Sequence, residues 1–384
     1  MRYRSVHKVT LAVFVLAALN LACSVFNQPT PIDNAPTSEE EVVSEVSEVN
    51  EVSDESEVSV DNILVDYVYT SELITIISPL YGKQLDDFFI ITITNNNELA
   101  VKVVVESEIT GYSDKSIDTV DVAAGEIIEV RQNPRIIPSV IDSLSSERFV
   151  QAHIRVVALQ DGVEKMLLDE TAETLLYARR DFPWSISGFT DDEVLELVAA
   201  MVMPHDPAVE ELIRNAAEYT DSGMMWAGYG NHIDDDDGGV WDRLQAIWQA
   251  EQDYDLAYIN TWVSFAPGSV QRIRLPAEVL DQRSGNCIEL AILYASAAEA
   301  LDLEAAIILV PGHAYVGIRT DQHNAIYYFI ETTMIGDTDF STAVDSAKRL
   351  FDETLPHLEA GDAGYGWVNI WDARQNGILP LQWK

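Results

Sequence analysis

The hydrophobic positions of this 384-residue chain repeat with two different periods. Between residues 61 and 181, short apolar and β-branched runs alternate with polar residues and turn signals, which is typical of β-strands. From Asp191 onward, apolar residues recur every three or four positions, which is typical of helices that bury one face. The pattern predicts an α+β protein with a β-rich first domain, 61–181, and a mixed second domain, 182–384.

The first domain is predicted to be an immunoglobulin-like β-sandwich, because it holds short strands at the spacing typical of that fold. It lacks cysteine, so no disulfide joins its sheets. His153 is expected simply to lie on one face of a strand. The predicted role is a spacer, or a platform for a substrate or partner. The expected strands are 88–94, 100–109, 117–122, 126–131, 148–159 and 164–168.

The second domain begins with helical patterns and continues with mixed elements. Trp241, Leu244, Ile247 and Trp248 fall on one helical face and are predicted to be core residues. Residues 365–374 are expected to close the domain as a strand or loop. The other expected elements are helices at 191–203, 208–219, 240–252, 276–280 and 341–353, and the segments 258–265 and 271–275 lead into the helix at 276–280.

Cys287 stands where a glycine-containing turn meets an apolar, alanine-rich run, 288–303, that is predicted to be a buried helix. Ser284 and Asn286 are the candidate N-caps of this helix. A thiol at a helix N-terminus lies at the positive end of the helix dipole, beside unpaired N–H groups. Both features favour the nucleophilic thiolate.

Three predicted strands follow this helix and carry two further reactive groups. The first, 305–310, ends at a Pro-Gly pair, and His313 opens the second, 314–318. The third, 325–330, is followed by Glu331. This order predicts a thiol, an imidazole and a carboxylate at one end of a sheet, which is the set that thiol acyl transfer requires.

These residues resemble the transglutaminase-like superfamily, relatives of the papain fold. The resemblance rests on Gly285-Asn-Cys287, on His313 in Gly-His-Ala-Tyr, and on Glu331 in Glu-Thr-Thr. It is close over residues 270–335 and weaker from 182 to the C-terminus. Many relatives have Asp-Pro where this chain has Glu331-Thr332. The resemblance implies a papain- or transglutaminase-like α+β domain with Cys287, His313 and Glu331 as its catalytic residues.

The predicted reaction is acyl transfer from an amide of a protein or peptide substrate, with no metal and no cofactor. The Cys287 thiolate attacks the carbonyl, His313 moves the proton, and Glu331 holds the imidazole tautomer. The Cys287 N–H is one expected oxyanion donor. Gln271, Trp262 and Tyr258 are the candidates for a second. Water would make the enzyme a protease or amidase, and an amine would make it a transglutaminase.

Each of these residues also has a structural interpretation that the sequence leaves open. Cys287 fits a small buried hydrophobe, His313 a core histidine, and Glu331 an ordinary acid at a strand end. The alternative function is an inactive surface protein that binds a peptide or glycan with the same fold. The aspartates at 234–237 lack the alternate spacing of a calcium loop, so a solvated loop or a charge cluster at a helix start is favoured over a metal site.

The net charge of −41 excludes nucleic-acid binding through phosphate neutralisation. Residues 1–23 combine a basic start with an apolar run too short to span a membrane, which is typical of an export signal. The end of that run resembles a lipoprotein signal with Cys23 as the lipid attachment site; secretion with an unmodified cysteine is the alternative. Residues 24–60 predict an acidic, extended linker. We therefore expect a lipid-anchored protein of the cell membrane that faces away from the cytoplasm.

Overall fold

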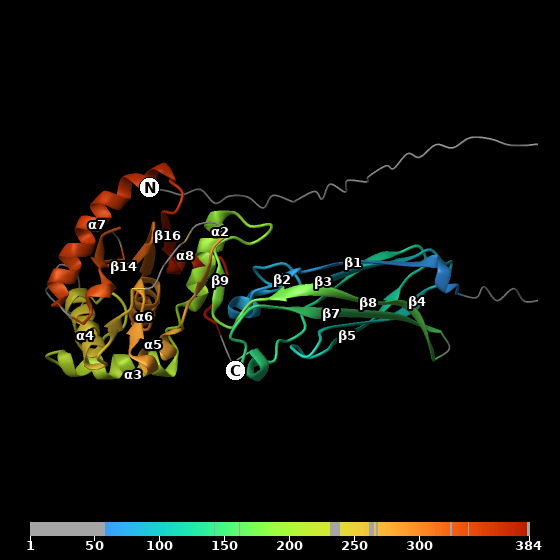
Figure 1. The fold of residues 1–384 in the computed structure, drawn as a ribbon, viewed down its shortest axis with the longest axis horizontal. Helices are drawn as coiled ribbons and strands as arrows, with labels where there is room; N and C mark the ends of the chain where they lie inside the picture. The colour runs from blue at the N-terminus through green and yellow to red at the C-terminus, as the bar shows by residue number, and fades with distance from the viewer. Residues whose placement is uncertain are drawn as a thin grey trace, which may run out of the picture. The chain divides into compact units, whose positions relative to one another are not determined.

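The β region forms two sheets that share an apolar core (Figure 1). One sheet has the strand order β1-β3-β6, and the other has the order β2-β8-β7-β4-β5. Neighbouring strands pair antiparallel except β2, which runs parallel to β8. The bounds are β1 (Ile63–Tyr69), β2 (Glu72–Leu73), β3 (Phe89–Asn95), β4 (Val101–Ile109), β5 (Ser116–Val122), β6 (Ile127–Gln132), β7 (Arg148–Gln160) and β8 (Val163–Leu176).

This computed structural model describes residues 58–141, 143–160, 162–230, 239–260, 265, 268–322, 325–336 and 338–381. The predicted signal segment, Cys23, nearly all of the 24–60 linker, Trp262 and the aspartates at 234–237 lie outside these residues. Residues Glu55–Lys384 form one compact unit, and the proposed division at residue 182 stays a prediction. Within the described part of the chain, no helix is both long and apolar enough to cross a bilayer.

Alternation along the strands builds the core between the two sheets. In β3 every second residue is buried, and Ile91 and Ile93 are fully inaccessible to solvent. Polar groups that enter this core are paired, as burial requires. Gln132 on β6 accepts a hydrogen bond from the Ser107 hydroxyl of β4 at 2.6 Å and donates to the Val105 carbonyl at 3.1 Å. These contacts join the two sheets.

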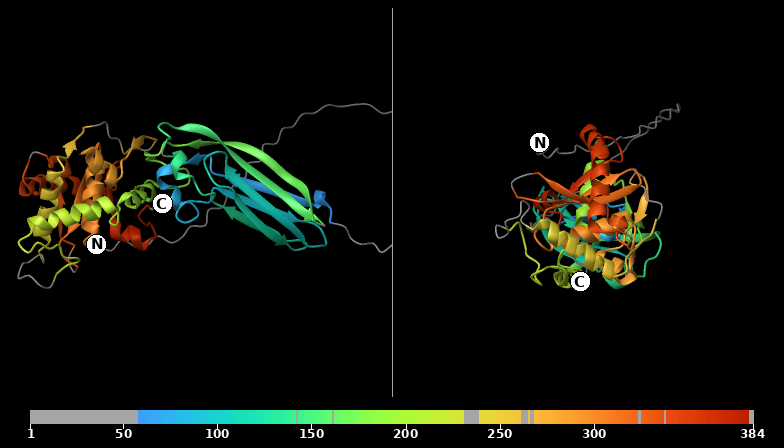
Figure 2. Two further views of the ribbon diagram at one scale, coloured as in Figure 1. Left: turned by 90° about the horizontal axis from the view of Figure 1, so that it is seen from below. Right: turned by 90° about the vertical axis from the view of Figure 1, so that its left-hand side faces the viewer.

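The six predicted strands of this region are confirmed as β3 to β8, with β8 much longer than expected. Prediction stopped it at residue 168, because the polar residues that follow resemble a loop. In the structure, β8 continues to Leu176 and forms a long hairpin with β7 (Figure 2). The pairing has a register shift at Val156/Val157. Most of β8 is exposed or half-buried, so pairing with β7 and not burial defines the strand.

The second region is built on a sheet of order β15-β14-β13-β16 with a helix on each face. Adjacent residues of β13 join different clusters: Ile307 and Leu309 pack in the main core, while Ile308 and Val310 pack with α7 residues. Helix α6 packs on β14, and α7 packs on β15. The elements are α6 (Cys287–Glu299), β13 (Ala305–Val310), β14 (His313–Arg319), β15 (Tyr327–Ile330), α7 (Phe340–Ala360) and β16 (Gly366–Asn369).

The remaining elements surround this sheet. The predicted helix faces are confirmed on α4, where Leu244, Ile247 and Trp248 are buried and Trp241 packs on Phe340. The bounds are α1 (Pro138–Ile141), β9 (Asp181–Pro183), α2 (Asp191–Glu196), α3 (Pro207–Ala216), α4 (Val240–Asp253), β10 (Ala257–Tyr258), β11 (Val270–Arg272), α5 (Pro276–Gln282), β12 (Ser284–Gly285) and α8 (Ile370–Gln375), with 3-10 turns η1 (Val60–Asn62), η2 (Thr75–Leu80), η3 (Leu197–Met201), η4 (Ala217–Tyr219) and η5 (Thr332–Met334).

The C-terminal tail differs from the expected single strand or loop. Its first part is β16, which pairs antiparallel with β13, but its second part is the helix α8. Helix α8 is held by Arg374, which binds Glu299 of α6 at 2.9 Å and donates to the carbonyls of Ala199 and Val202. Contacts with distant segments therefore set this helix, and its own six residues carry little helical signal.

Glu251 on α4 is a carboxyl group in the apolar core. It is 1% exposed, and its Oε1 has no hydrogen-bond partner among the described residues. Desolvation by burial raises its pKa well above the usual 4.5, because a buried charge without a partner is costly. The carboxyl group of Glu251 is therefore neutral in the folded protein. The free energy of unfolding consequently decreases as the pH rises.

We expect Glu251→Gln to stabilise the protein increasingly as the pH rises. Below pH 4.5 the carboxyl group is neutral in both the folded and unfolded states, so an amide changes little. Above that pH, the carboxyl group of Glu251 loses its proton in the unfolded chain but keeps it in the folded chain. This lowers the free energy of unfolding of the parent, whereas the amide of the variant has no proton to lose. Thermal unfolding at pH 5 and pH 8 should show a difference in Tm that grows with pH. Glu353→Gln on the exposed side of α7 should show no such growth.

Candidate active site

Helix α6 begins at Cys287 because its first turn is capped reciprocally. The Asn286 side chain accepts from the Glu289 N–H at 3.1 Å, and Glu289 Oε2 accepts from the Asn286 N–H at 2.9 Å. This is a capping box built on asparagine and glutamate. Of the two candidate N-caps, Asn286 is confirmed, while Ser284 lies in β12 and does not cap the helix.

The capping box leaves two N–H groups of the first turn open. The Leu290 N–H already bonds to the Asn286 carbonyl within the helix. Across the described part of the chain, no acceptor bonds to the N–H of Cys287 or of Ile288. Buried N–H groups are nearly always paired in folded proteins. Two open donors beside a thiol therefore form a ready site for an anionic oxygen.

A two-residue turn fixes where His313 lies. Strands β13 and β14 pair so that Val310 faces His313 across the Pro311-Gly312 turn. Gly312 has φ +77°, which proline-glycine turns provide and other residues adopt only with strain. His313 is therefore the first residue of β14 and directly follows the turn that joins this strand to β13.

Glu331 follows the last residue of β15 and meets the imidazole. Its Oε2 lies 2.7 Å from His313 Nε2, and its Oε1 accepts from the Thr333 hydroxyl at 2.5 Å and the Thr333 N–H at 3.2 Å. The side chain of Glu331 is 9% exposed and that of His313 is 25% exposed. Thr333 thus orients the carboxylate whose second oxygen holds His313, a role that the sequence had not assigned.

The pKa of His313 is raised from 6.5 to about 10. Burial lowers it, but this is outweighed by hydrogen bonding with the Cys287 side chain and with Glu331, and by the charges of both groups. Because Nε2 faces Glu331, Nδ1 is the ring nitrogen left for the thiol. The three residues predicted from the sequence therefore come together, from the start of α6, the start of β14 and the end of β15.

Cys287 is free and fully buried, with a relative exposure of 0%. The sulfur is therefore within reach of the imidazole but not of bulk solvent. A substrate can reach it only when neighbouring side chains move. Tyr258, whose side chain is exposed, pairs with Gly285 of the turn that precedes Cys287.

The candidates for a second oxyanion donor have different outcomes. Tyr258 pairs with Gly285, and its pKa is raised by desolvation and then by the charges of Cys287 and Glu331, so it lies near the site. Gln271 on β11 is 7% exposed, and neither atom of its amide has a partner among the described residues. Among the described residues, no hydrogen bond joins Gln271 to Cys287. Trp262 lies outside the described residues.

Histidines and acids elsewhere do not gather into a metal site. In the ranges that the structure describes, no group of three or more Cys, His, Asp and Glu side chains is placed to hold an ion. His153 lies on a face of β7, as predicted, and its Nε2 is 2.8 Å from Asp169. His357 binds Asp362 and stacks on Tyr365 at the end of α7.

The geometry can be set beside known proteins. Residues 275–349 match the family model of the transglutaminase-like superfamily. The matched segment runs from the start of α5 into α7 and includes Cys287, His313 and Glu331.

Other comparisons add little. No curated protein matches the chain. Among solved structures, it is similar to a FixG-related protein from Vibrio parahaemolyticus, with 11% identity and a TM-score of 0.21, over 30% of this chain and 97% of that one. A likeness at this TM-score bears on neither fold nor function.

We expect Glu331→Gln to lower the pKa of His313 from about 10. Loss of a neighbouring negative charge typically changes such a pKa by about one unit or more. A raised histidine pKa stabilises the fold fully below pH 6.5, and this contribution is lost as the pH rises toward 10. In the variant this contribution should therefore be smaller, and its loss should be complete at a lower pH than in the parent. NMR titration of the ring, assigned with His313→Gln, measures the pKa directly.

The matched control is Thr333→Ser, which keeps the hydroxyl that orients Glu331 and should leave the titration of His313 nearly unchanged. A Glu331→Gln protein in which the ring titrates as in the parent would show that the carboxylate does not hold the imidazolium.

Proposed function

We propose that this protein is a cysteine acyl-transfer enzyme acting on amide bonds, of the protease or amidase type or of the transglutaminase type. One observation carries the proposal: His313, hydrogen-bonded to Glu331 at 2.7 Å, interacts with a thiol whose helix start offers two open N–H groups. A buried core cysteine needs neither an oriented imidazole nor open donors. The match of residues 275–349 to the transglutaminase-like superfamily supports this interpretation.

The proposed reaction has two halves. The Cys287 sulfur forms a bond to the amide carbonyl carbon, and the oxygen becomes an anion that the N–H groups of Cys287 and Ile288 receive. Collapse breaks the carbon–nitrogen bond, and the imidazolium of His313 gives its proton to the leaving amine. Water or a second amine then attacks the thioester and loses a proton to His313, and the carbon–sulfur bond breaks, which releases the acyl product and returns the Cys287 thiolate. Glu331 keeps the ring oriented throughout and takes no proton itself.

A second oxyanion donor from a side chain remains part of the proposal. Gln271 is the best candidate, because its buried amide lacks any partner among the described residues. An amide in this state costs free energy unless a ligand completes it, and each such donor typically contributes about 2.7–4 kcal/mol to a transition state.

The second candidate function is an inactive surface protein that binds a peptide or glycan with the same fold. The burial of Cys287 favours it, since burial restricts the access of a substrate to the thiol. The two functions differ in whether the thiol reacts faster than free cysteine.

We expect iodoacetamide at pH 6 to modify Cys287 faster than free cysteine, because an imidazolium partner keeps the thiolate present. His313→Gln should slow the reaction by about 10–100-fold. Cys287→Ala should abolish release of amine from amide substrates. Mass spectrometry of the peptide that holds Cys287 measures the first effect. Thr333→Ser serves as the control that preserves the polar contacts, and an inert thiol in the parent would favour the binding protein.

We also propose that Cys23 carries a lipid that anchors the chain outside the cytoplasm. The support comes from the sequence alone, namely the export-type segment and the acidic 24–60 linker. Cys23→Ala should move the protein from the membrane fraction to the soluble fraction, and mass spectrometry of the mature N-terminus should find acyl chains in the parent only. An unmodified N-terminal peptide from membranes would rule out the anchor.

We further infer that residues 61–181 are an immunoglobulin-like sandwich. The orders β1-β3-β6 and β8-β7-β4-β5 agree with those of strands A-B-E and G-F-C-C′ in such domains. An experimental structure in which β7 does not lie between β8 and β4, or β3 does not lie between β1 and β6, would overturn this assignment.

A further inference from the structure

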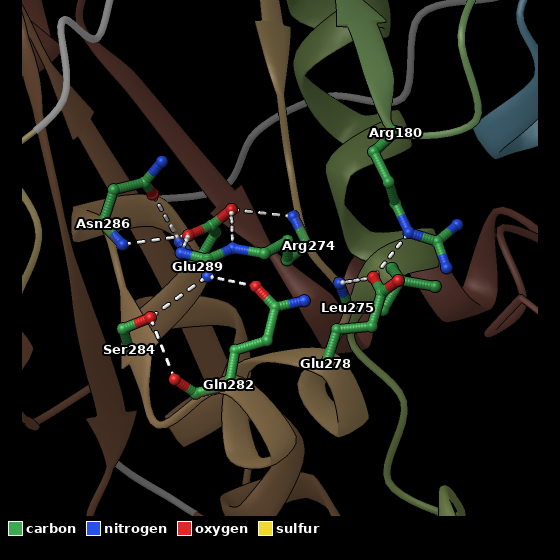
Figure 3. Close-up of polar contacts among 8 residues, drawn as sticks. All are labelled: Arg180, Arg274, Leu275, Glu278, Gln282, Ser284, Asn286 and Glu289. Carbon is green, nitrogen blue, oxygen red and sulfur yellow. Dashed lines mark hydrogen bonds and ion pairs between the residues drawn. The ribbon is translucent and has the colours of Figure 1, made fainter. Parts of the chain in front are cut away.

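A buried ion pair lies behind the first turn of the cysteine helix (Figure 3). Glu289, the third residue of α6, is 2% exposed, and Arg274 binds both of its carboxylate oxygens. The distances are 3.1 Å from Nε to Oε1 and 2.7 Å from Nη2 to Oε2. The N–H of Arg274 adds a third contact to Oε1 at 2.8 Å. The proposed mechanism uses neither side chain.

Arg274 is itself held in place by neighbours on the nucleophile turn. Its Nη1 donates to the Gln282 side chain at 2.9 Å and to the Ser284 hydroxyl at 3.2 Å (Figure 3). Planar, forked contacts of this kind are specific to arginine. The guanidinium thus links the end of α5, the strand β12 and the start of α6.

The negative charge of Glu289 disfavours the thiolate of Cys287, which lies two residues earlier in the same helix. A negative charge in the first turn stabilises the helix, yet it also opposes a thiolate at the same helix end. A free carboxylate would in addition compete for the open N–H groups of Cys287 and Ile288. Arg274 removes both effects, because it neutralises the charge and fixes Oε2 on the Asn286 N–H.

We propose that Arg274 is a positioning residue that compensates the charge of Glu289, so that the start of α6 remains positive toward Cys287 and its N–H donors stay open. This inference rests on the proposed function and deepens it. The other ionisable groups around the thiol are His313 on β14, Glu331 after β15 and Tyr258 on β10. In the described part of the chain, no hydrogen bond or ion pair joins any of them to Glu289.

The test is the pH profile of Cys287 alkylation by iodoacetamide in the full chain, followed on the Cys287 peptide by mass spectrometry. Arg274→Met leaves the carboxylate uncompensated. It should move the midpoint of the profile up by about one pH unit and slow the reaction about tenfold at pH 6. Glu289→Gln keeps the size of the side chain and removes the charge, so it should move the midpoint down.

The double variant Arg274→Met/Glu289→Gln separates charge from architecture. Charge compensation predicts a midpoint close to that of the parent, although the ion pair is gone. A purely structural role predicts a double variant at least as impaired as the single one. If a substitution only changed the accessibility of the buried sulfur, the alkylation rate would change by the same factor at every pH and the midpoint would stay the same. The pH profile therefore distinguishes a change in accessibility from a change in charge.

A matched control is available on the preceding helix. Arg180 donates from Nε to Glu278 Oε2 at 2.5 Å, and Glu278 accepts from the Leu275 N–H at 3.1 Å, which reproduces the arrangement on α5. Arg180→Met should lower the melting temperature and leave the alkylation midpoint unchanged.

The outcomes separate the two proposals. A parent protein that reacts no faster than free cysteine overturns the proposed function. A parent that reacts fast, with midpoints for Arg274→Met and Glu289→Gln equal to its own, overturns the role of Arg274 alone. Glu289→Gln is nearly isosteric, so it provides this test even if Arg274→Met does not fold.

Discussion

The candidate site depends on how a buried helix start satisfies its N–H groups. Every α-helix begins with N–H groups that have no partner within the helix, and at the start of α6 these groups belong to buried residues. Asn286 and Glu289 satisfy two of these groups, and the open two lie at Cys287 and Ile288. Such an arrangement is stable only if the buried carboxylate has a partner, which Arg274 provides.

The same sheet that buries α6 also supplies the groups facing its first residue. His313 and Glu331 belong to neighbouring strands, and the pairing of Val316 with Ile330 sets their offset. The imidazole therefore does not depend on a long loop for its position. Side chains on rigid strands are positioned with the precision that acid–base chemistry requires. On a loop, the same side chains could be fixed only at a cost in conformational entropy.

The sequence was sufficient for the parts of the site that local chemistry defines. Apolar runs and the Pro311-Gly312 pair placed β13 and β14, and the glycine-containing turn placed the helix at Cys287. The pattern Asn286-x-x-Glu289 is also a local capping signal, and it could have identified the true N-cap. Arg274 could not be found in this way, because its pairing with Glu289 exists only once α5 has folded against α6.

Strand β16 has a consequence for how the protein is made. It is the outer neighbour of β13, yet it follows α7 in the chain and is translated more than fifty residues after β13. While the ribosome is still producing α7, β13 presents an unsatisfied edge that invites pairing with other nascent chains. The region can complete its sheet only after residues 366–369 have emerged. Its folding is therefore deferred until late in synthesis, whereas the β region upstream can form beforehand.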